Sequence, residues 1–375
     1  MRVTLVASLL ALALSGCGEK QPRTTTPGTA ELGVASSRPA VEPTTASDSD
    51  SPFLQEMKAL GPQLASCEQL EEDAECEAWG EWKSLYWRGI EHLPVAQAAR
   101  IESELCALLD SPNRMLRLAG AVGLGAAGRP MLSAEVATRV VRALEREDDE
   151  GVVAALLLTT NWINFKERRD LSARYVAMLK AARTDPERLD VLLQRAGDLV
   201  GAGEVLLDVF EEAPQWQRRE LLWSAARMDP AEGCPIFERA LKEPNPKFHA
   251  ATINTMSSGT PCPALWDQAI AWITKTKMPT ASAATNAVGN LDFTPVGVME
   301  RYCRQPLSPD QRARLLKQTK RFSTPPGPAV VRTAALHAVL QCDPRSRPFV
   351  EGYTSDADPE VAKFARGLLD ATQDH

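Results

Sequence analysis

The N-terminal segment ends in the residue whose type and place most clearly predict a chemical modification. A short positive start containing Arg2 precedes an apolar run that continues to Leu14, and Ser15-Gly16-Cys17 follows. The apolar run is shorter than the roughly 18 residues that a membrane-spanning helix needs, so it predicts a secretion signal. Small residues followed by a polar segment are typical of the site where such a signal is cleaved.

Residues 14 to 17 resemble the lipobox of bacterial lipoproteins. The resemblance implies that residues 1 to 16 are removed and that the thiol of Cys17 carries diacylglycerol, with acyl chains such as palmitate anchoring the chain to a membrane. Gly18 stands where the inner-membrane retention signal has aspartate. By the same resemblance we expect the outer membrane of a two-membrane bacterium, in contact with the periplasm or on its other side. An ordinary secretory signal with an accidental cysteine is the alternative.

Seven of the eight cysteines lie beyond Cys17, and export makes disulfides among them permissible. An odd number leaves at least one thiol unpaired within the chain. The predicted pairs are Cys67 with Cys76, Cys234 with Cys262, and Cys303 with Cys342. We expect each bridge to stabilise the fold by roughly 2 to 4 kcal/mol. No cysteine spacing suits a zinc site or a redox pair, so we predict neither.

The reasons for the three pairs differ. The first closes a short acidic loop. Cys234 and Cys262 both precede prolines at expected helix starts one repeat apart, and the third pair follows by elimination. Cys106 is flanked by Leu105 and Leu109 on an apolar helical face, which predicts a buried free thiol.

A basic segment at residues 308 to 322 is a candidate face for an anionic partner. Against Asp310 alone it carries five cations: Arg312, Arg314, Lys317, Lys320 and Arg321. Such a face could meet lipid headgroups or an acidic protein. A solvated helix surface is the alternative. Farther upstream, Trp79, Trp82, Tyr86 and Trp87 predict packing that caps the first repeat, with ligand stacking as the alternative.

Residues 123 to 128 match the dinucleotide-binding fingerprint GxGxxG, and Glu145 lies about where a ribose-binding acid is sought. The fingerprint needs a preceding strand, whereas the residues before Gly123 fit a helix. Glycines at the end of a helix explain the same letters, so we predict no cofactor.

The remaining residue types also argue against an enzyme. The histidines are scattered without HxH or HExxH spacing: His92, His249, His337 and His375. Neither a GxSxG elbow nor a phosphate-binding GxxxxGK[ST] loop occurs. The net charge of −7 makes a nucleic-acid partner improbable, because phosphate binding needs a surplus of positive charge.

The chain divides into a linker and a folded body. Residues 17 to 52 begin with the acylated cysteine and contain five Pro, six Thr and five Ser after it, so they predict a disordered tether. From residue 53 to 375, amphipathic helical patterns are punctuated by Pro, Gly and Asp, with almost no strand-like alternation. In residues 131 to 146, Val136, Val140 and Leu144 form one apolar face. The body is therefore predicted to be all-α.

Four segments repeat a proline or aspartate start followed by small residues. They begin near Pro112, Pro246, Pro328 and Pro359, with the proline expected in the first helical turn. These segments resemble the second helix of HEAT repeats. With weaker copies between them, the spacing of roughly 30 to 36 residues predicts a right-handed α-solenoid of about seven to nine two-helix units. A tetratricopeptide array and a closed helical domain are the alternatives.

We therefore expect a membrane-anchored envelope lipoprotein that acts as a non-catalytic protein-protein interaction scaffold, with an envelope protein as its partner. An elongated stack of repeats offers a long concave surface for such a partner. The first alternative is a structural or assembly factor of the envelope. The second is an enzyme, by resemblance of the repeats to HEAT-like phycobiliprotein lyases.

Overall fold

A computed structural model describes residues 51–69, 76–89, 95–126, 132–259, 261–277 and 295–372. Every regular element among these residues is a helix and none is a strand, so the prediction of an all-α protein is confirmed for them. The chain divides into two compact units, residues 1–159 and 160–375. None of the described helices is both long and apolar enough to cross a membrane. The predicted signal, Cys17 and residues 18–50 of the predicted tether lie outside the described residues. The last two residues of the predicted tether belong to the folded body instead, because Ser51 is the N-cap of α2 and Pro52 is its first residue.

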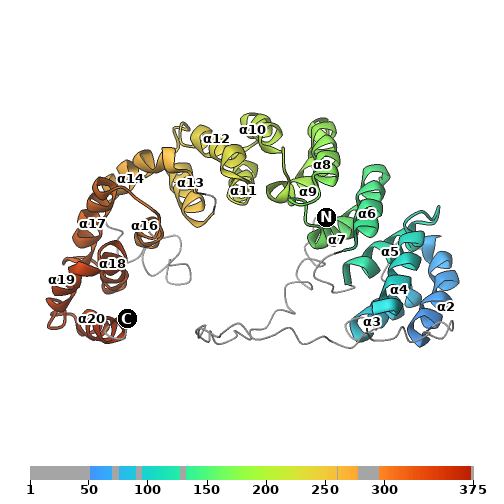
Figure 1. Ribbon diagram of the computed structural model, residues 1–375, viewed down its shortest axis with the longest axis horizontal. Coiled ribbons are helices and arrows are strands. Elements are labelled where there is room, and N and C mark those ends of the chain that lie inside the picture. Colours follow the sequence, from blue (N-terminus) through green and yellow to red (C-terminus); the bar gives the residue numbers. More distant parts are fainter. Residues whose placement is uncertain are drawn as a thin grey trace, which may run out of the picture. The chain divides into compact units, whose positions relative to one another are not determined.

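Unit 1 consists of helices that pack in two rows. Its helices are α2 (Pro52–Ser66), α3 (Glu77–Gly89), α4 (Val95–Leu108), α5 (Arg114–Ala126), α6 (Ala134–Arg146) and α7 (Glu150–Thr159), with a 3-10 turn η1 (Cys67–Gln69) after α2. Helix α4 packs on α6 in one row, and α3, α5 and α7 pack in sequence in the other (Figure 1). Helix α2 packs on α3 and α5.

Unit 2 also consists of helices, with short 3-10 turns among them. Its helices are α8 (Arg169–Ala181), α9 (Pro186–Leu193), α10 (Gly203–Glu212), α11 (Gln215–Ala225), α12 (Pro230–Ala240), α13 (Pro246–Ser258), α14 (Trp266–Lys275), α16 (Pro295–Cys303), α17 (Pro309–Ser323), α18 (Ala329–Cys342), α19 (Arg347–Glu351) and α20 (Pro359–Ala371). The 3-10 turns are η4 (Thr160–Trp162), η5 (Ala182–Thr184), η6 (Ala196–Asp198), η7 (Pro263–Leu265) and η9 (Pro344–Ser346).

Two rows are also present within unit 2 (Figure 1). Helices α8, α10 and α12 pack in sequence, as α14 and α17 do farther along. The other row, which we call the second row, consists of α9, α11, α13, α16, α18 and α20, each packed on the next. Connections between consecutive helices, such as α17 to α18, join the rows. Each helix thus buries one side against its own row and one against the other.

The sequence patterns explain where the helices begin. The apolar side of α6 holds the predicted Val136, Val140 and Leu144, all buried. The helix starts at Ala134 because the hydroxyl of Ser133 accepts a hydrogen bond from the N–H of Val136 at 3.3 Å. A capping box closes the start of α17, where Ser308 and Gln311 each bind the other's backbone N–H.

The prolines of the four repeat segments occupy different positions. Pro246 and Pro359 stand in the first turn of α13 and α20, as predicted. Pro328 is instead the N-cap of α18, and Pro112 precedes α5. At α5 the side-chain oxygen of Asn113 takes over the cap by accepting from the N–H of Leu116 at 3.1 Å, so the proline is not needed there.

The glycines of the GxGxxG segment serve close helix packing. Gly123 and Gly125 lie inside α5, so a helix precedes this segment, as predicted; Gly128 lies outside the described residues. A Cβ atom on Gly125 would lie 3.0 Å from the hydroxyl oxygen of Thr159 on α7. A Cβ atom on Gly120 would lie 2.8 Å from the carbonyl oxygen of Leu105 on α4. Gly125 of the GxGxxG segment and Gly120, which precedes the segment, therefore let α5 approach α7 and α4 closely.

Candidate functional site

Helix α11 presents two tryptophans to solvent. Trp216 is 59% exposed and Trp223 is 41% exposed, and the other large hydrophobic side chain exposed among the described residues is Phe364 on α20. The two tryptophans are seven positions apart, so they leave the helix on the same side. Burial of an indole is strongly favourable, and its exposure twice on one helix face marks a candidate binding surface.

The buried side of α11 fixes this face in place. Leu221, Leu222 and Ala225 are buried, and α11 packs on α9 and α13 in the second row. The hydroxyl of Ser224 donates to the carbonyl oxygen of Leu193 on α9 at 3.4 Å. Arg218 pairs with Glu243 at 3.0 Å. Because these contacts bury the apolar side of α11 against its neighbours, the opposite side of the helix, with Trp216 and Trp223, faces solvent.

Polar side chains surround the two indoles. Gln215, Arg219 and Glu220 are all exposed. Arg219 and Glu220 stand between the tryptophans along the helix, and the side chain of neither forms a hydrogen bond or ion pair with another described residue. We call this surface the α11 face; it consists of Gln215, Trp216, Arg219, Glu220 and Trp223. It combines two apolar rings with one positive and one negative side chain that have no ion pair with another described residue.

The basic residues predicted on α17 do not form one open face. Arg314 pairs with Asp267 at 3.3 Å and with Asp310 at 3.8 Å. Arg321 donates to the carbonyl oxygen of Thr276 at 2.7 Å. The ammonium of Lys320 lies 4.9 Å from the ring centre of Phe349. Lys317 is exposed. The side chains of Arg314, Lys320 and Arg321 therefore already contact other groups within unit 2.

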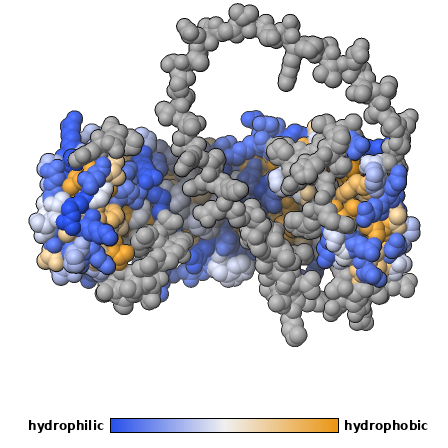
Figure 2. All heavy atoms as spheres, turned by 90° about the horizontal axis from the view of Figure 1, so that it is seen from below, coloured by the Kyte–Doolittle hydropathy of each residue, from blue (hydrophilic) through white to orange (hydrophobic). Residues whose placement is uncertain are grey.

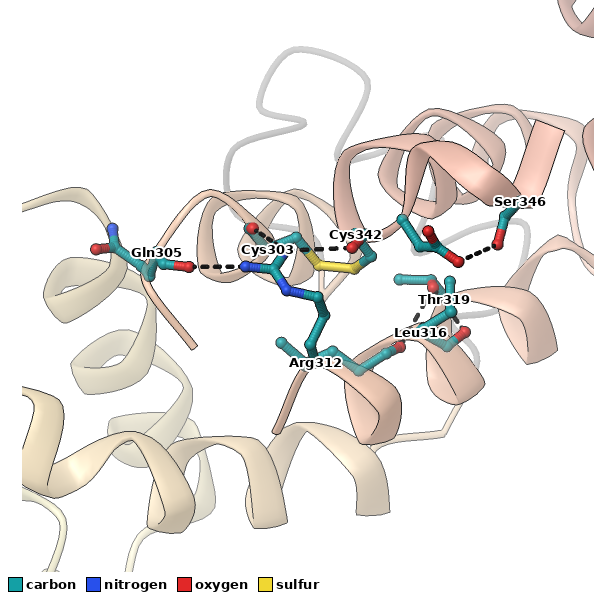
Figure 3. Close-up of a disulfide and its surroundings, with 9 residues drawn as sticks. Cys303, Gln305, Arg312, Leu316, Thr319, Cys342 and Ser346 are labelled. Atoms are coloured by element: carbon teal, nitrogen blue, oxygen red, sulfur yellow. Dashed lines mark hydrogen bonds between the residues drawn. A yellow bond between two sulfur atoms is a disulfide. The ribbon is translucent and has the colours of Figure 1, made fainter. Parts of the chain in front are cut away.

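Arg312 of α17 points toward the disulfide of Cys303 and Cys342 and has a structural role (Figure 3). Its guanidinium donates to the carbonyl oxygens of Cys303 at 2.9 Å, Cys342 at 3.1 Å and Gln305 at 3.2 Å. Cys303 and Cys342 are the last residues of α16 and α18, where helix carbonyls lack partners within the helix, and Gln305 lies two residues beyond the end of α16. Arg312 is therefore directed away from any anionic partner, a position that charge counting along the sequence does not reveal.

The structure brings together the three predicted cysteine pairs. The Cα atoms of Cys67 and Cys76 are 5.7 Å apart, those of Cys234 and Cys262 are 5.6 Å apart, and those of Cys303 and Cys342 are 4.6 Å apart. All three lie within the range of a disulfide. Cys234 does not open a helix as expected. It lies inside α12, which begins at Pro230.

Cys106 is buried in α4 and is the free cysteine of the described residues. Burial raises the pKa of its thiol to about 11, so the thiol is neutral at physiological pH. A thiol needs its thiolate form to act as a nucleophile, and this one is both protonated and enclosed. Cys106 therefore belongs to the core of unit 1.

The other residues considered from the sequence are placed as follows. Trp79 and Trp82 are buried, and the indole N–H of Trp82 donates to the carbonyl oxygen of Ala119 at 3.2 Å, which makes both rings part of the core. The side chains of Tyr86 and Trp87 lie outside the described residues.

His249 and His337 are half-buried, and Nδ1 of His337 lies 3.3 Å from Glu300. His92 and His375 lie outside the described residues. Across the described ranges no three His, Cys, Asp or Glu side chains are grouped to hold a metal ion.

The surface at the C-terminal end is mixed in character. Figure 2 shows hydrophilic side chains over much of the described surface at its left, where α19 and α20 lie, with small hydrophobic patches between them. Phe364 on α20 is 39% exposed, beside the exposed Lys363 and Gly367. Single exposed apolar residues of this kind are ordinary on protein surfaces, whereas the α11 face holds two indoles in register.

The α11 face was not predicted from the sequence. The sequence analysis singles out neither Trp216 nor Trp223, which lie in or next to one of the weaker repeat copies. The available signal is the seven-residue spacing of Trp216 and Trp223 with mostly polar residues between them.

Comparisons with known proteins do not place the chain in a family. No family model matches it, and no curated protein matches it. Among solved structures, a crystal structure of an engineered protein is similar over 86% of this chain and 91% of its own, with 13% sequence identity and a TM-score of 0.41. A likeness at this level carries no argument about fold or function.

Proposed function

We propose that this chain is a membrane-anchored envelope lipoprotein whose body is a non-catalytic scaffold for protein-protein interaction. In this proposal residues 1 to 16 are cleaved and Cys17 carries the lipid. The HEAT-like repeats form a right-handed α-solenoid at the end of the tether, at the outer membrane of a two-membrane bacterium. The lipobox resemblance of residues 14 to 17 supports the anchor.

The observation that carries the scaffold proposal is the second row of unit 2. Six helices from α9 to α20 pack each on the next, and the row has an outward side with exposed polar residues such as Lys247 on α13 and Gln341 on α18. A partner that lies along such a row contacts many helices at once, which is how stacked helical repeats bind proteins. We propose that the partner binds to this exposed side of the second row, and that this side is the concave surface of the solenoid.

A photo-crosslinking experiment in cells tests the proposal. A photoreactive amino acid replaces Lys247 or Gln341 on the second row, or Lys180, an exposed residue of α8 in the first row, as the matched control. We expect the two second-row positions to give one adduct containing the same envelope protein, identified by mass spectrometry. We expect the control to give none, and the Cys17→Ala chain to lose the adduct because it leaves the membrane.

The outcomes are decisive in both directions. Adducts that contain the same partner at Lys247 and Gln341 and are absent at Lys180 support the scaffold. If neither second-row position gives an adduct above the control, or if the two give unrelated proteins, the scaffold proposal is overturned.

A further inference from the structure

Four exposed cations gather where α14 and α17 end. Lys275 is the last residue of α14, and Lys277 follows two positions later. Lys317 and Arg321 are four positions apart on α17, so they lie on the same side of that helix, one turn from each other. The side chains of the three lysines form no hydrogen bond or ion pair with another described residue. We call these four residues the basic patch.

Two side chains of α17 hold the end of α14 beside it. The guanidinium of Arg321 donates to the carbonyl oxygen of Thr276 at 2.7 Å, and Thr276 stands between the two lysines at the end of α14. The side-chain amide of Gln318 donates to the same oxygen at 3.0 Å. A carbonyl oxygen carries no net charge, so Arg321 remains an exposed cation while it ties the two helix ends together.

The acidic residues of the surrounding helices are engaged elsewhere. Asp267 and Asp310 are the only acidic residues of α14 and α17, and both contact Arg314, at 3.3 and 3.8 Å. Helix α18, which packs on α17, contains no acidic residue. On α16, which also packs on α17, Glu300 pairs with Arg304. The basic patch is therefore a local surplus of positive charge.

We infer that the basic patch binds the phosphate headgroups of an anionic phospholipid bilayer. Each lysine or arginine close to such a surface raises the affinity roughly fivefold. The attraction falls off within a Debye length of about 8 Å at physiological ionic strength. The local charge of the patch, rather than the net charge of −7 of the whole chain, therefore decides which side of the protein meets the membrane.

Two observations favour a bilayer over an acidic protein. Three of the four cations are lysines, whose ammonium groups are hydrated point charges on flexible stems and lack the rigid fork with which arginine fixes a carboxylate. A protein hot spot also needs a buried aromatic or apolar anchor. The large hydrophobic side chains exposed among the described residues are Trp216, Trp223 and Phe364, and none of them belongs to α14 or α17. Attraction to headgroups needs neither feature.

The inference adds a second membrane contact to the proposed function. Its effect in the cell rests on the proposed anchor at Cys17, which would keep the chain within reach of the bilayer, whereas the affinity of the patch for headgroups does not need the anchor. The patch belongs to the row of α14 and α17, and the proposed protein partner binds along the second row. Headgroups and partner therefore occupy different rows of unit 2.

Co-sedimentation with lipid vesicles tests the inference. The chain from residue 17 to 375 is used with Cys17→Ser, so that it contains every described helix but carries no lipid. Vesicles of phosphatidylcholine alone are compared with vesicles that also contain phosphatidylglycerol, at low and at high ionic strength. We expect binding to the anionic vesicles, little binding to the neutral ones, and a loss of affinity as salt is added.

Variants of two patch lysines separate local charge from net charge. Lys277→Gln/Lys317→Gln is expected to lose affinity for the anionic vesicles about 25-fold, and Lys277→Glu/Lys317→Glu more than that. Lys277→Arg/Lys317→Arg keeps both charges and is expected to stay within about twofold of the wild type. The matched control, Lys180→Glu/Lys363→Glu on α8 and α20, changes the net charge as much as the patch glutamates do and is expected to bind as the wild type does. Circular dichroism checks that each variant has the helical content of the wild type.

The inference is overturned if the wild type binds neutral and anionic vesicles equally, if the patch glutamates leave the affinity unchanged, or if the matched control loses as much. A wild type that binds polyglutamate but not the anionic vesicles assigns the patch to an acidic protein and also overturns it. None of these results involves the lipid at Cys17 or the crosslinks at Lys247 and Gln341, so failure here is distinguishable from failure of the proposed function.

Discussion

The guanidinium of Arg312 donates a hydrogen bond of 3.1 Å to the carbonyl oxygen of Cys342, which lies 30 residues further along the chain. The same guanidinium nitrogen donates to the carbonyl oxygen of Cys303 at 2.9 Å (Figure 3). Arg312 of α17 therefore donates hydrogen bonds to the last carbonyl oxygens of both α16 and α18. The disulfide between Cys303 and Cys342 joins the same two helix ends.

Replacing Arg312 should destabilise unit 2 more than replacing Arg314, because Arg312 donates hydrogen bonds to three carbonyl oxygens whereas Arg314 forms exposed ion pairs. Arg312→Ala leaves three carbonyl oxygens without their donor, and we expect the free energy of unfolding to fall by about 2 to 3 kcal/mol. Arg312→Lys should restore little, since an ammonium cannot direct donors as a guanidinium fork does. Urea denaturation followed by circular dichroism measures this. The control Arg314→Ala loses only exposed ion pairs and should change stability by less than about 1 kcal/mol; equal losses for both variants would refute the role given to Arg312.

A second prediction concerns acid sensitivity in unit 1. Both oxygens of the buried Glu147 accept hydrogen bonds from Arg117, at 2.7 and 3.0 Å. Burial by itself would raise the pKa of Glu147, but the hydrogen bonds and charge of Arg117 and the backbone N–H of Asp149 lower it below its usual range. Since the folded pKa is lowered, the stabilisation is complete above the ordinary glutamate pKa of about 4.3 and is lost as the pH falls through the folded value.

Glu147→Gln should therefore lower stability at pH 7 by about 3 kcal/mol, because it leaves a half-buried guanidinium without its partner charge. The difference from the wild type should shrink as the pH falls below about 4. Urea denaturation between pH 7 and pH 3 measures both effects. Glu135→Gln, at an exposed site on α6, is the control and should follow the wild type throughout. A constant difference at every pH would contradict the assigned pKa direction.

A third prediction separates two glycines of unit 1. A Cβ atom on Gly120 would lie 2.8 Å from a backbone oxygen of α4, whereas a Cβ atom on Gly80 in α3 would have no neighbour within 4 Å. Gly120→Ala should destabilise the fold by about 1 to 3 kcal/mol, because backbone must move. Gly80→Ala should stabilise it by about 0.5 to 1 kcal/mol, since alanine loses less chain entropy in a helix. Thermal unfolding of the two variants should shift in opposite directions, and shifts of the same sign would count against the close approach of α4 and α5.

The cysteines allow a fourth prediction. With three bridges, a lipid on Cys17 and a raised pKa for Cys106, the native chain should react with no thiol reagent at pH 8. In denaturant without reductant one thiol, Cys106, should react, and after reduction all seven cysteines beyond Cys17 should do so. Mass spectrometry of the labelled peptides counts them. More than one reactive thiol before reduction would show that a bridge is missing.

Some of these features could be predicted from the sequence because they depend on neighbouring residues. The apolar spacing of Val136, Val140 and Leu144 specifies a helix and its buried side without reference to the rest of the chain. The pair Cys67 with Cys76 follows from a separation of nine residues along the chain. In both cases the information lies within one or two adjacent elements.

The remaining features depend on contacts between distant elements. Five cations on residues 308 to 322 predict a basic face, but the carbonyl oxygens that bind Arg312 and the carboxylate of Asp267 that binds Arg314 come from other helices. The exposure of Trp216 and Trp223 likewise depends on which side of α11 the neighbouring α9 and α13 cover. A sequence pattern alone assigns an indole to the core, since that is where most are found.

The proposed lipid at Cys17 is central to the proposed function, because such an anchor would place the scaffold and its tether at a membrane. The direct measurement is intact mass spectrometry of the N-terminal peptide after the full chain is produced in a two-membrane bacterium and its membranes are separated. The account predicts a mature chain that begins at Cys17, carries diacylglycerol and sediments with the outer membrane, while Cys17→Ala appears in the aqueous fraction. A wild-type chain that retains Met1, or that is found unmodified in the aqueous fraction, would contradict it.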